Sequence, residues 1–242
     1  MSVMITMVGT GHVFKIFEQV AFIVKYTWPD AVLVELDERR YAALTCDSGS
    51  DRDSEDLPRL YRETAEYQDR MSKENEAATG SDMLAAIQTG RAAGADIVCI
   101  DMDAEQTMRE VEEGMSSCER MRYSVSSVTD RFFGRERLKL TQSRFAADEE
   151  KYVRKMRRRF PTLVEKLIDE RNEYMAERIR EASEKYKNMV VVVGDAHVKG
   201  ICEILEGIDV YKIRLADMMD QERMNDIKSS IWNRKAEAQE WT

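Results

Sequence analysis

The residues of this chain that could carry chemistry gather where its apolar segments end. The protein contains only two histidines, His12 and His197. Each lies three residues after a glycine that closes an apolar run, in the segments GTGH (residues 9–12) and GDAH (residues 194–197). Open α/β sheets bind their ligands just past the carboxyl ends of buried strands. A histidine in such a place is usually a hydrogen-bonded structural residue, but the repeated context favours a functional role for both.

Acidic and basic side chains are predicted to lie near the histidines. Glu35 ends a second apolar run, and Asp101 and Asp103 follow a third. Glu170 and Arg171 interrupt the apolar stripe of the helix that precedes the His197 segment. A charged pair in this position either lies at the edge of the apolar face or faces a polar pocket, and the proximity to His197 favours the pocket.

Two chemistries are open to this set of residues. In the first, two imidazoles and a carboxylate bind a divalent metal with positions left for water, whose pKa the metal lowers while it polarises a carbonyl. A further carboxylate would then be the general base, and an arginine would hold a substrate carboxylate or stabilise an oxyanion. In the second, a histidine assisted by carboxylates is the base without a metal. No serine or cysteine has an identifiable partner for nucleophilic catalysis.

The first 36 residues predict the geometry that would bring two of these residues together. Apolar runs predict strands over Ser2–Val8 and Ala31–Leu36, and the helical spacing of apolar residues predicts a helix over Phe14–Thr27. A short strand–helix–strand connection implies a parallel pair with a right-handed crossover. His12 and Glu35 would therefore lie at the same edge of a sheet.

The chain before His197 predicts the centre of that sheet. Four consecutive valines end at Val193, and such a run needs burial on both faces, as in a central parallel strand. We therefore expect an α/β fold with a central, mostly parallel β-sheet flanked by helices. Further strands are predicted over Asp96–Ile100 and Ile208–Leu215. One helix is predicted over Asp37–Leu44, with Asp37 as its cap, and another runs to Ala93 with Ser81 or Asp82 as its cap. The other predicted helices are Leu57–Ala78, one that begins at Glu105, Ser116–Lys139, Glu149–Lys187 with a break at Pro161, Val198–Leu205 and Ala216–Trp232.

Length and composition limit the class of protein. The 242 residues suffice for one α/β domain with a real core. We expect a single domain over residues 1–242, with a helical insertion at about 104–187 and a loose acidic loop at about 46–56. The net charge of −9 argues against a nucleic-acid-binding protein. No apolar run approaches the roughly 20 residues that span a membrane, and no secretion signal is present, so we expect a cytoplasmic protein without a membrane span.

Two other features are expected to be structural. The four cysteines show no CxxC spacing, so neither a zinc ribbon nor a redox motif is expected. The basic residues between Lys151 and Arg159 could contact an anionic partner, but a solvated helix face is the commoner explanation and the one that composition favours.

Several segments, taken together, carry a resemblance to a known family. They are VGTGHVFK near the N-terminus, PDAVLVELDERRYAAL, DMLAAIQTGRAAGADIVCIDMDAEQT, DERNEYMAERI and VVVVGDAHVKGI. From Met4 to about Leu215 the chain resembles the TraB/PrgY family, which is related to the Tiki proteases and shares a superfamily with erythromycin esterase-like (EreA) and ChaN-like proteins. The resemblance implies a central sheet wrapped by helices.

The resemblance also implies roles for individual residues. His12 and His197 of the two GxxH segments would be metal ligands, with Glu35 as a further ligand or a catalytic carboxylate. Glu170 and Arg171 would be catalytic residues that orient the substrate or support the ligands. The implied cofactor is a divalent metal: manganese, cobalt or zinc.

Several functions remain open. The first is a metal-dependent, peptidase-like hydrolase that acts on a peptide or on a small amide or ester. The alternatives are a protein that binds and sequesters a peptide without turnover, a metal-independent esterase-like hydrolase, and a scaffold with a vestigial site.

The chain differs from the family pattern at the second GxxH segment, where Asp195 replaces the small residue that the family has at this position. Many microbial relatives carry membrane helices after the domain. A homodimer is the expected oligomer, because two-fold dimers are common.

Overall fold

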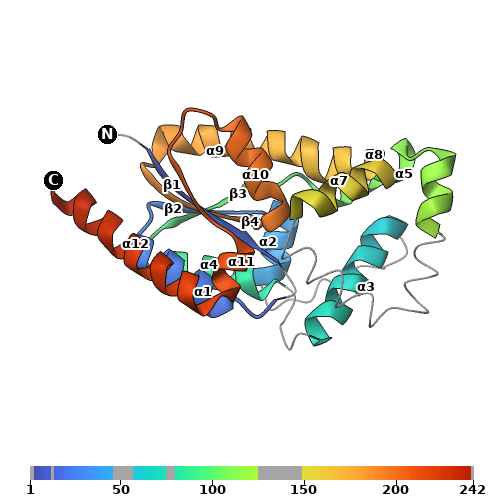
Figure 1. Cartoon of the computed structure of the whole chain (residues 1–242). Coiled ribbons are helices and arrows are strands. Elements are labelled where there is room, and N and C mark those ends of the chain that lie inside the picture. Colours follow the sequence, from blue (N-terminus) through green and yellow to red (C-terminus); the bar gives the residue numbers. More distant parts are fainter. Residues whose placement is uncertain (1–2, 12–13, 46–56, 75–79, 125–148, 241–242) are drawn as a thin grey trace.

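A five-stranded parallel sheet forms the centre of the protein, with helices on both faces (Figure 1). The computed structural model describes residues 3–11, 14–45, 57–74, 80–124 and 149–240. Every pair of neighbouring strands is parallel, which confirms the predicted α/β class. The strand order is β3-β2-β4-β1-β5, with bounds β1 Met4–Thr10, β2 Ala31–Val34, β3 Asp96–Cys99, β4 Asn188–Gly194 and β5 Val210–Ile213.

Helices connect the strands in the order that the apolar patterns predict. Pro161 begins a new helix directly after a break at Phe160, as the sequence indicates. A further helical segment covers residues 117–124. The other helices are α1 Phe17–Thr27, α2 Glu38–Thr45, α3 Arg59–Glu74, α4 Ser81–Ala92, α5 Ala104–Gly114, α7 Glu149–Arg159, α8 Pro161–Val164, the π-helix η2 Glu165–Asp169, α9 Glu170–Lys185, α10 Asp195–Ile204, α11 Leu215–Met219 and α12 Gln221–Glu240.

The four-valine run forms the central strand. β4 lies between β1 and β2, with Val192 opposite Val8 on one side and Val34 on the other. The side chains of Val190–Val193 are fully buried because helices cover both faces of the sheet. The prediction of a central parallel strand is therefore confirmed.

The two faces of the sheet have separate helical layers. Val192 and the other side chains on its face pack against α1, α4 and α12. Val191 and Val193 point the opposite way, since alternate residues of a strand face opposite sides, and they pack against α9 and α10. The connection that leaves β4 therefore lies on the other face from those that leave β1 and β2. Open α/β sheets bind ligands at such a reversal.

The structure corrects two predicted helix starts. α10 begins at Asp195 rather than at Val198, so His197 lies in the first turn of a helix and not in a loop. The predicted side-chain cap of α4 at Ser81 or Asp82 is wrong. Gly80 holds the N-cap position with a φ of +75°, a backbone conformation that favours glycine.

The predicted C-terminal helix is divided in two. α11 ends at Met219, and α12 begins at Gln221. Asp220 separates them because its Oδ1 atom accepts hydrogen bonds from the backbone N–H groups of Glu222 and Arg223, at 2.9 and 3.0 Å. A side chain in this role starts a new helix.

Some predictions fall outside the described residues. His12 and the acidic loop at 46–56 are among them, as is the helix predicted over Ser116–Lys139 beyond residue 124. Among the helices that the structure describes, none is long and apolar enough to cross a membrane. The single domain with a helical insertion stays a prediction.

Candidate functional site

The carboxyl edge of the sheet places Glu35 beside His197. Glu35 directly follows β2, and His197 lies in the first turn of α10, which follows β4, the neighbour of β2. Glu35 Oε1 lies 3.4 Å from His197 Nε2. Both residues are buried, with 4% and 3% of their surface exposed. Two residues that the sequence selected from distant segments therefore share one buried site.

Asn172 of α9 fixes the orientation of the imidazole. Its Oδ1 atom lies 2.7 Å from His197 Nδ1, and Asn172 is itself buried. An amide oxygen can only accept a hydrogen bond, so this contact places the proton on Nδ1. The Nε2 atom of a neutral His197 then offers its lone pair on the side of Glu35.

A glycine makes room for this contact. A Cβ atom on Gly200 would lie 2.2 Å from the amide nitrogen of Asn172. Gly200 is one turn after His197 on α10, so the absence of its side chain lets α9 bring Asn172 to the imidazole. Neither residue stands out in the sequence, because each lies within an ordinary amphipathic helix.

Glu35 is held by donors from two elements. The backbone N–H of Gly194, at the end of β4, donates to Oε2, and Nη2 of Arg171 donates to Oε1. Arg171 lies on α9, one residue before Asn172. Both side chains that hold the Glu35–His197 pair thus come from the first turn of the same helix.

Arg171 also joins Asp101 to the site. Its Nε and Nη2 atoms lie 2.9 and 2.7 Å from the two carboxylate oxygens of Asp101, in a bidentate ion pair. Asp101 accepts a further bond from Arg40, whose Nε atom lies 2.8 Å from Asp37 Oδ2. A continuous network of ion pairs therefore extends from the cap of α2 to Glu35.

The network favours the charged forms of Arg171, Arg40 and Asp37. Burial alone would lower the pKa of Arg171, but the carboxylates of Glu35 and Asp101 raise it above its ordinary value. Burial also opposes the charge of Arg40, and Asp101 and Asp37 nevertheless raise its pKa. For Asp37, burial raises the pKa, but hydrogen bonds and the positive charge of Arg40 outweigh it and lower the pKa.

The site carries more negative than positive charge. Glu35, Asp101 and Asp37 supply three carboxylates, and Arg40 and Arg171 supply two guanidinium groups. One negative charge remains when His197 is neutral. An additional positive charge near Glu35 would balance it, and buried charges are stable only when they are paired.

A π-helical segment ends two residues before Arg171. The residues Glu165–Asp169 form this wide turn, and Arg171 Nη1 donates a 3.1 Å hydrogen bond to the carbonyl of Leu167 within it. π-helical insertions occur frequently at functional sites. The turn shifts the phase of the apolar stripe, and this shift allows a charged residue to face the interior.

Glu170 does not join this network in the described residues. Its carboxylate oxygens lie 2.7 and 2.9 Å from Nζ of Lys166, one turn earlier, and its side chain is about one-third exposed. Arg39 is also separate from the site, since it is exposed and pairs with Glu105 of α5. Of the predicted pair at positions 170 and 171, the structure brings only Arg171 to Glu35.

Asp195 faces away from the imidazole. Its carboxylate accepts two bonds of 2.8 Å from Arg214 and one of 2.9 Å from the backbone N–H of Leu215. A Cβ atom on Gly9 would lie 2.2 Å from Asp195 Oδ1, so the glycine of the first GxxH segment gives this carboxylate its space. Asp195 thus ties β1, α10 and α11 together and is not an added carboxylate for the site.

The described donors fit part of a metal site. Two ligands bound to one ion at about 2.1 Å lie roughly 3.0–3.4 Å apart, and the 3.4 Å between His197 Nε2 and Glu35 Oε1 agrees with this range. Within the described part of the chain, no group of three or more His, Cys, Asp and Glu side chains could hold a metal ion. The remaining predicted ligand, His12, lies outside it.

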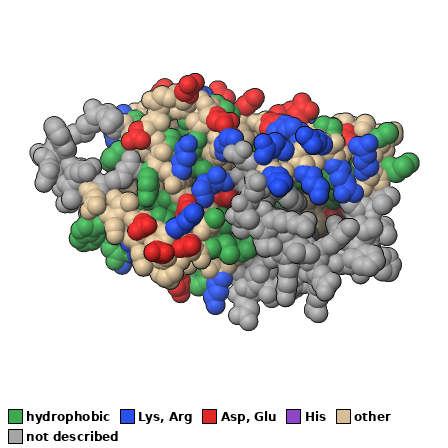
Figure 2. All heavy atoms as spheres, in the orientation of Figure 1, with side chains coloured by type: hydrophobic (Ala, Val, Ile, Leu, Met, Phe, Trp, Pro, Cys, Tyr) green, Lys and Arg blue, Asp and Glu red, His purple; other side chains and the backbone are tan. Residues whose placement is uncertain are grey.

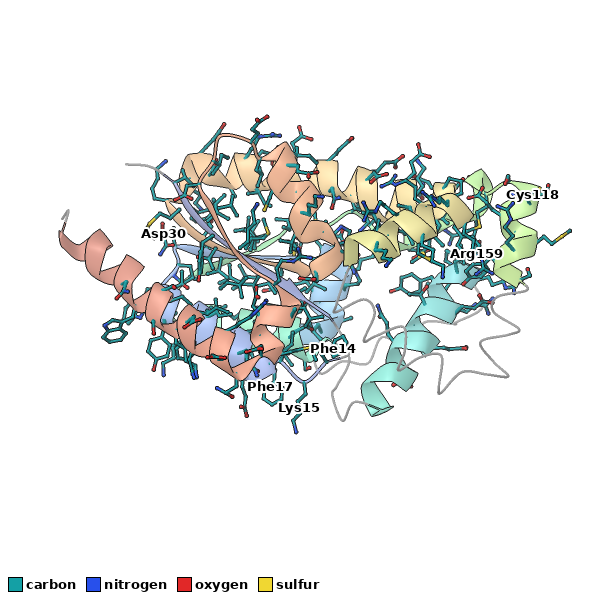
Figure 3. The ribbon with its side chains drawn as sticks, viewed as in Figure 1. Phe14, Lys15, Phe17, Asp30, Cys118 and Arg159 are labelled. Carbon is teal, nitrogen blue, oxygen red and sulfur yellow. The ribbon has the colours of Figure 1, made fainter. Side chains whose placement is uncertain are left out.

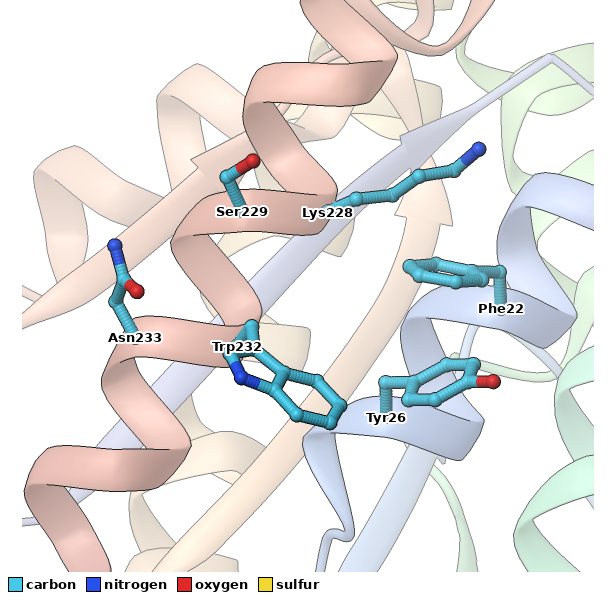
Figure 4. A pocket seen from close by; sticks show the side chains of 6 residues that line it. All are labelled: Phe22, Tyr26, Lys228, Ser229, Trp232 and Asn233. Carbon is cyan, nitrogen blue, oxygen red and sulfur yellow. The ribbon is translucent and has the colours of Figure 1, made fainter.

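A separate cavity lies on the opposite face of the sheet. It is an open groove of about 440 Å³ between α1 and α12 (Figure 4). Phe22 and Tyr26 stack within it at 4.4 Å between ring centroids, and Lys228 lies over the Phe22 ring. None of the residues that line the groove belongs to the predicted site.

Comparison with known proteins agrees with the sequence motifs. The sequence model of the TraB/PrgY/gumN family matches residues 2–209. An uncharacterised protein of Methanocaldococcus jannaschii is 28% identical over 217 residues, which are 85% of this chain and 54% of that protein. The chain therefore spans about half the length of this relative. The matched residues include Glu35, Arg171 and His197, and the chain belongs to the TraB/PrgY/gumN family.

Proposed function

We propose that this chain is a metal-dependent hydrolase that cleaves a peptide or a small amide or ester. The observation that carries the proposal is the buried Glu35–His197 pair, with the imidazole oriented by Asn172 and the carboxylate by Gly194 and Arg171. A site in which every group has a fixed partner is preorganised, as catalysis requires.

The residues of the chain would divide the work as follows. His197 Nε2 and Glu35 Oε1 would hold a divalent ion such as manganese, cobalt or zinc, together with His12. The ion would lower the pKa of a water molecule and polarise the substrate carbonyl. If Glu35 is not a ligand of the ion, it would instead be the base that accepts the proton of that water. In either case Arg171 would stabilise the negative charge that develops on the carbonyl oxygen.

A second candidate is a protein that binds a peptide without cleaving it. The observation that favours it is the saturation of the carboxylates: Arg171 donates to both Glu35 and Asp101. A carboxylate that already accepts charged hydrogen bonds is a weaker base. In this case the same edge of the sheet would be a polar recognition surface.

Metal content and turnover separate these functions. Protein purified without a metal-affinity tag would be analysed for metal, and a defined peptide mixture would be incubated with protein loaded with manganese, cobalt or zinc and then examined by mass spectrometry. We expect cleavage by the wild type, and its loss together with reduced metal content in His197→Ala. Glu177→Gln, which replaces an exposed carboxylate on the same helix as Arg171, is the matched control and is expected to retain activity.

Each contrary result has a definite meaning. Undiminished metal in His197→Ala would exclude this ligand. Peptides that bind and are recovered intact would favour the sequestering protein, and cleavage that survives strong chelation would favour the metal-independent hydrolase. The cytoplasmic location and the homodimer stay predictions.

A further inference from the structure

Helix α7 presents an uncompensated basic surface. Its sequence contains six basic and two acidic residues, in a chain whose net charge is −9. Within the part of the chain that the structure describes, four exposed side chains have no carboxylate partner, and we call them the α7 strip. The α7 strip consists of Arg154, Lys155, Arg158 and Arg159.

The spacing of the α7 strip opposes helix stability. Arg154 and Arg158 lie four residues apart, as do Lys155 and Arg159, so like charges face each other one turn apart and destabilise the helix. Other helices of the chain place a carboxylate at this spacing. Examples are the pairs Arg59–Glu63, Glu105–Arg109, Lys166–Glu170 and Lys199–Glu203.

The helix dipole explains only part of this pattern. Cations are favourable in the last turn of a helix, where Arg158 and Arg159 lie. Arg154 and Lys155 precede that turn and gain little from it. Arg157, between the two pairs, does have a partner, since its guanidinium binds the carboxylate of Asp169. Among the described residues, the four exposed side chains of the α7 strip thus remain without a carboxylate partner.

The α7 strip lies near the candidate site. α7 packs against α10, whose first turn carries His197. Figure 2 shows Lys and Arg side chains gathered over this part of the surface, and Figure 3 shows Arg159 on the side of the molecule away from Asp30. Asp30 marks the amino edge of the sheet, where it binds the backbone N–H of Asn188. The basic surface therefore lies on the same side of the molecule as the carboxyl edge of the sheet.

We infer that the α7 strip binds an acidic segment of the peptide that occupies the site, an inference that rests on the proposed function. An 11-residue helix is about 16 Å long, which matches roughly five residues of extended peptide. A nucleic acid would need a basic interface of about 1,000 Å² or more. The acidic remainder of this chain would repel such an extended polyanion. The structure thus favours a docking role over the solvated face that composition suggests.

The test measures binding separately from cleavage. A fluorescein-labelled decapeptide of glutamate and glycine is titrated with the full chain, and anisotropy is followed at low and high salt. A decapeptide with glutamine in place of glutamate is the ligand control. The strip variant combines Arg154→Gln, Lys155→Gln and Arg158→Gln. The matched variant combines Lys25→Gln, Lys187→Gln and Lys212→Gln, which removes the same charge from exposed positions elsewhere.

We expect the strip variant to bind the acidic peptide about tenfold more weakly, the matched variant to change less than about twofold, and salt to weaken the wild type. An equal loss of affinity for the acidic peptide in both variants would overturn the inference. So would a ten-nucleotide single-stranded DNA that binds through the same side chains more tightly than the acidic peptide does. Binding that depends on the α7 strip without any cleavage would support the inference while the proposed function fails. If the strip variant cleaves the acidic peptide as fast as the wild type does, the proposed function stands and the inference is excluded.

Discussion

Asn172 and His197 form a buried pair in which Oδ1 of the amide lies 2.7 Å from Nδ1 of the imidazole. This contact decides which ring nitrogen faces Glu35, and neither GxxH segment contains the residue that makes it. Partners of this kind orient metal-binding histidines in many proteins. The first two predictions therefore concern Asn172.

Replacing Asn172 by alanine should change which nitrogen of the imidazole carries the proton, while the imidazole itself remains. We expect the wild type to show the Nδ1–H tautomer at neutral to basic pH and Asn172→Ala to lose that preference. Metal affinity or activity should then fall about 10- to 100-fold. The chain has only two histidines, so long-range ¹H–¹⁵N spectra contain two ring systems. Asn172→Asp, which keeps an acceptor, should restore the Nδ1–H signal; an unchanged spectrum in Asn172→Ala would contradict the assignment.

Adding a methyl group at Gly200 should displace Asn172. The new Cβ would lie 2.2 Å from the amide nitrogen, so Gly200→Ala is expected to lower the free energy of unfolding by about 1–3 kcal/mol. In an Asn172→Ala background the obstacle is absent, and the same change should be neutral or stabilising because alanine favours a helix. Urea denaturation of the four proteins in this double-mutant cycle measures the coupling. Additive effects would show that the two side chains do not compete for space.

The sequence predicted the sheet well because its signals are local. The valines at 190–193 can be buried on both faces only as a central strand, and the short connection through residues 14–27 predicts that the strands on either side of it run parallel. β1 and β2 do run parallel, but β4 lies between them, so the prediction that they form a pair is wrong. Glu35 and His197 were selected by their position after such strands, and the structure places them 3.4 Å apart. Position along a strand was sufficient because parallel strands end at the same edge.

The sequence predicted the helical part of the site less well because it depends on contacts between helices. Arg171 was visible as a charge within an apolar stripe, but its neighbour Glu170 gave the same signal and pairs with Lys166 instead. Consecutive residues of a helix point about 100° apart, so only one of the two can face the sheet. The π-helix before them, which has no sequence signature, decides which one it is. Asn172 is a polar residue in a polar stretch, and only its contacts with His197 and Gly200 identify it.

Removing the Arg171 guanidinium should destabilise the protein strongly. Arg171→Met would leave the buried carboxylates of Glu35 and Asp101 without a shared counterion, and the loss of one partner from a buried ion pair costs about 3–5 kcal/mol. Arg157→Met is the matched control, because its pair with Asp169 is exposed and is worth about 0–1 kcal/mol. Urea denaturation at pH 7 measures both. Equal, small effects would show that the network does not stabilise the fold.

Glu119 should make stability depend on pH. This buried carboxylate accepts bonds from the backbone and hydroxyl of Ser116 and of Thr162, between 2.9 and 3.1 Å. Burial raises its pKa, but these four bonds outweigh burial and lower it. A group with a lowered folded-state pKa stabilises the protein above the ordinary carboxyl pKa, and that contribution disappears as the pH falls through the folded-state value.

Glu119→Gln tests this dependence because it removes the charge and keeps the size. We expect a loss of about 1–3 kcal/mol in the free energy of unfolding at pH 7, since glutamine presents a donor to groups that are themselves donors. The difference from the wild type should shrink as the pH is lowered towards about 3. Glu113→Gln, at an exposed position of α5, should change stability by less than about 0.5 kcal/mol at either pH. If the free energy of unfolding of Glu119→Gln differed from that of the wild type by the same amount at every pH, the shape of this side chain, and not its charge, would hold residues 117–124 against α8.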